Sequence, residues 1–241
     1  DPGYGKLNPF IRLLMPLLVP HQRQLDLEAA KQVDVFIANS TETQKRIKKY
    51  YKRSSTVIHP PVETSRFTPA RKRGDHYVTI GRQLPYKRYD LAIKAATRLN
   101  KKLIVFGNGP AHDQLVKLAG PTIEFRTDRF GDASDAEYEK AITTARGFIY
   151  PAEEDFGIVS VEALAAGAPV IGLARGGTTD IVTSPDVGTL FHHQTVDDIV
   201  KAIEIAEQTR FHPSKLARTA KRFDKGLFLT KIKKVVYDKC H

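Results

Sequence analysis

From about residue 77 onward, short apolar runs alternate with longer helical stretches, and this alternation constrains the fold more than any other feature. Each run is rich in β-branched or aromatic residues, and a turn with Gly or Pro follows it. Such alternation indicates a parallel sheet with helices on its faces. We therefore predict an α/β fold with one doubly wound domain of six strands. The expected strands are 77–80, 103–106, 122–125, 148–150, 170–173 and 189–191, and the expected helices are 89–99, 111–119, 135–145, 158–166 and 195–208.

The chain on either side of this domain has its own pattern. Residues 59–74 are rich in proline and charge, which makes this stretch the best candidate for a domain boundary. The segment before it resembles the end of another α/β domain. The elements expected outside the main domain are strands 33–37 and 56–59, a basic helix over about 41–52 capped by Ser40 or Thr41, and closing helices 214–222 and 226–238.

The composition is that of a globular protein. The 241 residues can bury a substantial core, and 41% hydrophobic with 27% charged residues argues against disorder. The single cysteine, Cys240, cannot form an internal disulfide, so we expect a reducing, cytoplasmic location. The most apolar stretch, 10–20, is interrupted by Arg12 and Pro16 and is about half the length of a membrane span. Because the only methionine is Met15, we expect a fragment or a processed product.

The formal net charge of +11 predicts an anionic partner. Residues 1–73 hold 14 Lys and Arg against 6 Asp and Glu. A face on an anionic membrane and an ordinary solvated helix surface both account for this bias. Nucleic acid is not expected as a partner, because the basic run 45–53 has aromatic residues only at Tyr50 and Tyr51 and no nucleic-acid motif is present.

Two loops after predicted strands contain residues suited to a phosphate ligand. Ligands of open parallel sheets bind beyond the carboxyl ends of the strands, near helix N-termini. In the loop 81–88, Arg82 offers a planar guanidinium and Lys87 a point charge, and both could reach one diphosphate. A solvated basic loop is the alternative. In the loop 107–110, Gly-Asn-Gly-Pro permits close approach of a ligand, but a tight turn explains it equally well.

A third loop is more distinctive, because acidic residues gather at the end of a predicted strand. Glu153, Glu154 and Asp155 precede Phe-Gly-Ile, and the helix that follows carries Glu162 about one turn inside its start. One acid beside a helix N-terminus is explained by the helix dipole. That explanation does not cover a cluster followed by a further acid on a helix of small apolar residues.

This loop resembles the E-x7-E signature of retaining glycosyltransferases of the GT-B type, also called glycosyl transferases group 1 or family 4. The resemblance extends over about residues 30–230. The motif sequences most resemble those of bacterial mannosyltransferases of surface-polysaccharide assembly. The matching segments are Glu154 to Glu162 with the text on both sides, the Arg-x-x-Pro-Tyr-Lys-Arg loop from Arg82, Gly176-Gly177, and 37–40. The implied fold is GT-B, with Rossmann-like doubly wound domains.

The resemblance also implies a role for each matching residue, in a family that generally needs no metal or other cofactor. Arg82 and Lys87 would bind the donor pyrophosphate, Glu162 the ribose hydroxyls, and the catalytic Glu154 the sugar hydroxyls. The remaining expected donor contacts are the backbone N–H groups of Phe156, Gly157 and Ile158, with Arg126 near the base. Two positions depart from the family pattern: 125–129 in place of Phe-Leu-Gly, and Asp180 in place of a glutamate.

By the same resemblance, roughly the first half of a complete enzyme is missing. We expect this chain to bind donor but to transfer sugar poorly or not at all. The implied regions are a remnant of the acceptor-side domain at 1–60, a linker at 61–74, a donor domain at 75–225 and a crossover helix at 226–241.

The expected reaction is transfer of a hexose, with mannose favoured, from a nucleoside-diphosphate sugar to a glycan or lipid-linked acceptor. GDP-mannose is favoured over a UDP-sugar as donor, and peripheral association with the inner membrane face is expected. Two alternatives stay open. One is a non-catalytic nucleotide-sugar-binding or lectin-like module, and the other is a GT-B sugar-nucleotide epimerase, which would need further acids and histidines.

Overall fold

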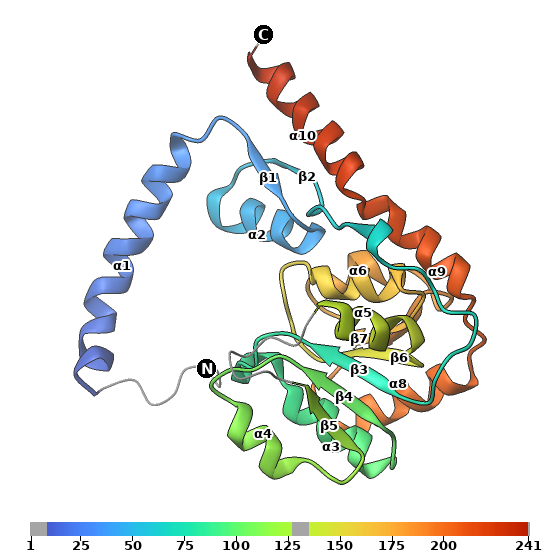
Figure 1. Ribbon diagram of the computed structural model, residues 1–241. Helices are drawn as coiled ribbons and strands as arrows, with labels where there is room; N and C mark the ends of the chain where they lie inside the picture. The colour runs from blue at the N-terminus through green and yellow to red at the C-terminus, as the bar shows by residue number, and fades with distance from the viewer. Residues whose placement is uncertain (1–8, 127–134, 241) are drawn as a thin grey trace.

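The structure is a computed structural model that describes residues 9–126 and 135–240 (Figure 1). Its main body is a six-stranded parallel sheet in the order β5-β4-β3-β6-β7-β8, and helices connect successive strands. The predicted α/β doubly wound fold is therefore confirmed. The strands are β3 (Tyr77–Ile80), β4 (Leu103–Phe106), β5 (Ile123–Arg126), β6 (Gly147–Tyr150), β7 (Val170–Leu173) and β8 (Gly188–Phe191).

The central strands are apolar along their whole length because helices cover both faces of the sheet. Every residue of β4, β6 and β7 is buried. One core cluster contains side chains of α5, α6 and α9, and the other contains side chains of α3, α4 and α8. The helices are α3 (Tyr89–Arg98), α4 (His112–Leu118), α5 (Asp135–Thr144), α6 (Ile158–Ala165), α7 (Thr178–Ile181), α8 (Val196–Gln208), α9 (Pro213–Ala220) and α10 (Lys225–Cys240), with short 3-10 turns η1 (Thr64–Arg66), η2 (Pro85–Lys87) and η3 (Lys221–Phe223).

The strand order reverses between β3 and β6. From β3 the chain adds β4 and β5 on one side, and from β6 it adds β7 and β8 on the other. At such a switch point the loops that leave the two central strands diverge and open a crevice at the carboxyl edge of the sheet. The loops after β3 and β6 are the two that contain Lys87 and Glu154.

A smaller parallel pair, β1 (Phe36–Ala38) and β2 (Ser55–Val57), flanks α2 (Thr41–Tyr51). Ser40 caps α2, since its Oγ accepts the Thr43 N–H at 3.1 Å, which decides between the two expected caps. The first strand lies later than the predicted 33–37, because only its last two residues pair with β2.

Helix α1 (Pro9–Lys31) was not predicted, because Pro16 and Pro20 lie inside it and proline disfavours a helix interior. It extends away from both sheets in Figure 1, and large apolar side chains such as Leu17 are exposed on it. Among the described residues, no helix has the length and apolar character required to cross a bilayer.

The segment expected as a linker is held against the main domain. The Val62 N–H donates to the Phe223 carbonyl at 3.0 Å, and the Lys225 N–H donates back to Val62 at 3.1 Å. Phe67 is buried in the main core. The segment from β2 to β3 therefore packs against the main domain where it passes the start of α10.

Candidate functional site

A cleft of about 600 Å³ lies at the carboxyl ends of β3 and β6, where the strand order reverses. Its volume is within the usual range for small-molecule sites. Asn39, directly after β1, and Pro60, after β2, line one part of it, and the main domain contributes the rest. The main-domain residues that line it are Tyr86, Lys87, Tyr150 and 153–159.

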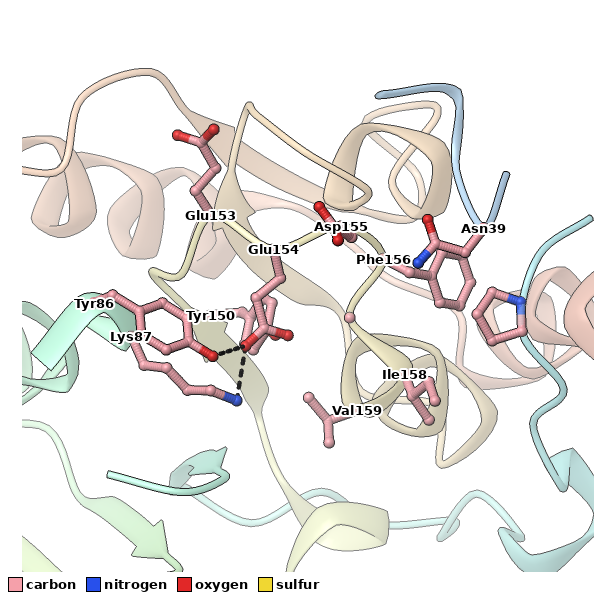
Figure 2. A pocket seen from close by; sticks show the side chains of 12 residues that line it. Asn39, Tyr86, Lys87, Tyr150, Glu153, Glu154, Asp155, Phe156, Ile158 and Val159 are labelled. Atoms are coloured by element: carbon pink, nitrogen blue, oxygen red, sulfur yellow. Dashed lines mark hydrogen bonds and ion pairs between the residues drawn. The ribbon is translucent and has the colours of Figure 1, made fainter. Parts of the chain in front are cut away.

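Glu154 is among the residues that line this cleft, and it has three partners. Its Oε1 lies 2.7 Å from Lys87 Nζ and 3.5 Å from the Tyr86 hydroxyl. Dashed lines in Figure 2 mark these two contacts. Its Oε2 accepts a hydrogen bond from Tyr150. The fold thus brings together Lys87 and Glu154, which are 67 residues apart in the sequence. The two tyrosines were missed, and only the position of Tyr150 at the end of a strand could have indicated its role.

Gly176 and Gly177 support the acidic loop from behind. The Gly177 N–H donates to the Glu154 carbonyl at 2.9 Å. A Cβ on Gly176 would lie 2.2 Å from that same carbonyl oxygen, and a Cβ on Gly177 would lie 2.2 Å from Phe156 Cα. This pair of glycines is therefore needed for close packing of two loops, which its sequence pattern did not reveal.

The loop that contains Lys87 is held by Gln83, which sequence reasoning also missed. Gln83 is fully buried, and its Nε2 donates to the Gly107 carbonyl at 2.6 Å. A Cβ on Gly109 would come within 2.7 Å of the Gln83 backbone. The glycines of 107–110 thus serve to pack this loop against 81–88, which favours the tight-turn interpretation over ligand approach.

Arg82 and Arg126 do not join Lys87 and Glu154 in this structure. The Arg82 side chain is exposed and makes no hydrogen bond or ion pair with any other residue in the described ranges. Arg126 Nε donates to Glu124 at 2.7 Å, and neither arginine lines the cleft. The rest of the predicted base-recognition stretch, 127–129, lies outside the described residues.

The turn into α6 consists of residues 156–158, and these three residues differ in burial and in backbone conformation. Phe156 is buried and packs against His59 and Phe223, with ring centroids 5.4 Å apart in both pairs. Gly157 adopts φ +93°, a conformation that favours glycine. Ile158 begins α6 and is exposed. The Phe156 side chain is therefore committed to packing, and the expected use of its backbone N–H stays a prediction.

Glu162 lies one turn further along α6, outside the residues that line the cleft. Its Oε2 accepts a hydrogen bond from the Tyr138 hydroxyl at 3.1 Å. Burial raises the pKa of the Glu162 carboxyl above its usual value, and the hydrogen bond from Tyr138 opposes this in part. The folded protein therefore holds this proton more tightly than the unfolded chain does.

This raised pKa predicts that Glu162→Gln stabilises the protein at pH 7. A carboxyl whose pKa is raised by folding makes stability fall as pH rises from its unfolded value through its folded value. The amide removes that loss and can still accept from Tyr138. Thermal melts should show a higher Tm for the variant at pH 7 and no difference near pH 4. A lower Tm at pH 7 would mean that the charged form is stabilised by its surroundings.

Two further contacts connect the smaller sheet to the cleft. Arg46 of α2 donates to Asp155 at 2.7 Å and lies 3.5 Å from Glu153. Asp180 accepts from the Thr41 N–H at 2.7 Å and lies 3.2 Å from His59 Nε2. Asp180, noted as a departure from the family pattern, therefore stabilises the N-terminus of α2.

The family model for glycosyl transferases group 1 matches residues 61–223. D-inositol 3-phosphate glycosyltransferase of Mycobacterium leprae is 30% identical over 167 residues, which cover 61% of this chain and 39% of that protein. The chain thus spans well under half the length of this curated relative.

Solved structures show the same fold at low sequence identity. Sucrose-phosphate synthase from Thermosynechococcus elongatus superposes with a TM-score of 0.75 at 18% identity, over 91% of this chain and 61% of that one. HepE from Anabaena, solved in complex with UDP and glucose, gives a TM-score of 0.75 at 18% identity, over 90% and 67%. The GT-B character of the fold is thereby confirmed.

Proposed function

Because this chain belongs to the glycosyl transferases group 1 family, we propose that it is the donor-binding portion of a retaining glycosyltransferase. The reaction is transfer of a hexose, with mannose preferred, from a nucleoside-diphosphate sugar to a glycan or lipid-linked acceptor. The observation that carries the proposal is the pairing of Lys87 with Glu154 at 2.7 Å in a cleft at the switch point.

The cleft offers opposite charges for the two ends of such a donor. The Lys87 ammonium suits the diphosphate, and the N-terminus of α6 adds a partial positive charge beside it. Both would stabilise negative charge that develops on the departing diphosphate. The Glu154 carboxylate accepts hydrogen bonds, which suits the hydroxyls of a sugar. Glu162, further along α6, is proposed for the ribose.

The match covers only 39% of the Mycobacterium leprae relative. We therefore propose that this chain alone transfers sugar slowly or not at all. A GT-B epimerase is less well supported. It would need additional acids and histidines, and the described residues that line the cleft include no histidine. GDP-mannose stays the preferred donor, although the HepE structure named above holds UDP.

A thermal-shift panel tests the proposal and identifies the donor. A ligand at 100 times its Kd stabilises a protein by about 2.7 kcal/mol, which raises Tm by roughly 5–10 °C in a chain of this size. We expect GDP-mannose to give the largest shift among GDP-mannose, UDP-glucose, GDP and UDP. If none of the four changes Tm, the cleft is not a sugar-nucleotide site.

A further inference from the structure

The two oxygens of Glu154 are held by groups of different kinds. Oε1 is paired with the ammonium of Lys87, whose side chain is 15% exposed. Oε2 accepts a hydrogen bond from Tyr150, which is fully buried at the end of β6. The exposed Tyr86 hydroxyl is a longer contact, 3.5 Å from Oε1. Of the two closer anchors, Lys87 is a cation beside an open cleft, and Tyr150 is a neutral hydroxyl fixed in the core.

The two anchors respond differently to a bound diphosphate. An ammonium beside a dianion is drawn toward it, so the Lys87 contact with Glu154 weakens when the donor arrives. The Tyr150 side chain cannot move toward the donor in the same way, because packing fixes its ring. Its ring stacks on Phe148 with centroids 5.8 Å apart, and a Cβ on Gly157 would already come within 3.1 Å of the ring. Burial also raises the pKa of Tyr150 above its usual value, so the phenol stays a donor across the working pH range.

We propose that Tyr150 is a positioning residue that holds Glu154 in place for the donor sugar after Lys87 has turned to the diphosphate. The assignment rests on the proposed function. In this arrangement, different residues bind the two halves of the donor. Lys87 binds the diphosphate, and Glu154, oriented by Tyr150, binds the sugar. A substitution at Tyr150 should then affect the sugar and spare the nucleotide.

Calorimetry of Tyr150→Phe with GDP-mannose and GDP tests this separation. The variant loses only a hydroxyl, and one hydrogen bond to a charged acceptor corresponds to roughly a tenfold change in affinity. We expect affinity for GDP-mannose to fall about tenfold, with affinity for GDP unchanged. UDP-glucose and UDP form the parallel pair if the wild-type chain prefers uridine.

Tyr77→Phe is the matched control. Tyr77 is also buried in a strand, and its hydroxyl donates to a carboxylate, Glu207, at 3.1 Å, outside the cleft. Its loss should leave both affinities at the wild-type value. If Tyr150→Phe leaves both affinities unchanged, or lowers both equally, Tyr150 does not position Glu154 and the inference is wrong.

A double variant tests whether Tyr150 acts through Glu154. Tyr150→Phe added to Glu154→Ala should cause no further loss of GDP-mannose affinity, because alanine leaves no oxygen for Tyr150 to orient. Additive losses would contradict the inference. If the wild-type chain binds GDP-mannose no more tightly than GDP, and UDP-glucose no more tightly than UDP, the inference about Tyr150 is also wrong. The proposal that the cleft binds a nucleotide would still hold in that case. A chain that binds none of the four ligands would overturn the proposed function itself.

Discussion

The Lys87→Ala variant is expected to lose about 100-fold in affinity for the sugar nucleotide and to keep the wild-type fold. Lys87 is the cation paired with Glu154 in the cleft, and its removal leaves a carboxylate facing an incoming diphosphate. The repulsion adds to the loss of the attractive contact. Stability should change little, because the Tyr150 hydrogen bond still satisfies Glu154.

Lys94→Ala is the control for this result. Lys94 is an exposed lysine on α3, the helix after the Lys87 loop, and its removal changes the net charge equally. Calorimetry with the best ligand of the thermal-shift panel should show wild-type affinity for Lys94→Ala. Unchanged affinity in Lys87→Ala would show that the diphosphate binds elsewhere.

Gly177→Ala is expected to weaken both the fold and ligand binding. The φ of Gly177 is −69°, so alanine is acceptable to the backbone and the effect is purely steric. The new Cβ would lie 2.2 Å from Phe156 Cα and 2.5 Å from the Asp155 carbonyl oxygen, and backbone atoms cannot turn aside as a side chain does. Overpacking of this kind costs about 1–3 kcal/mol, or roughly 2–12 °C in Tm.

Displacement of the 153–156 segment also moves Glu154 away from Lys87, so donor affinity should fall even at temperatures where the variant is folded. Gly226→Ala serves as the comparison, because a Cβ there meets only the Asp224 side chain, at 3.5 Å. Circular dichroism melts and calorimetry should show Gly226→Ala close to the wild type. A Gly177→Ala variant with wild-type Tm and affinity would mean that the loop has room to adjust.

Much of the main domain could be predicted because strands β4, β6 and β7 are apolar on both faces. The bounds of β3, β4 and β7 were predicted to the residue, and the other three strands differ by one residue at one or both ends. Such apolar runs end at a turn-forming or charged residue, so the ends of these strands can be read from the local sequence. Helix α1 was missed because its local sequence is misleading: Pro16 and Pro20 lie inside it, and proline disfavours a helix interior.

The candidate site was only partly predictable. Motif spacing identified Lys87 and Glu154, and the fold brings them together. Their supports come from distant parts of the chain: Tyr150 from β6, Gly177 from the turn after β7, and Arg46 from α2. No local pattern shows which tyrosine or glycine will meet a given carboxylate, because the strand order brings them together. The ligand-binding roles of all the predicted site residues, Lys87 and Glu154 included, stay predictions.

The most direct test of the account is a crystal structure of the 241-residue chain with the nucleoside diphosphate that stabilises it most. We expect a diphosphate within hydrogen-bond distance of Lys87 Nζ, beside the N-terminus of α6, with the ribose hydroxyls at the Glu162 carboxylate. A nucleotide bound away from the cleft between the loops after β3 and β6 would contradict it.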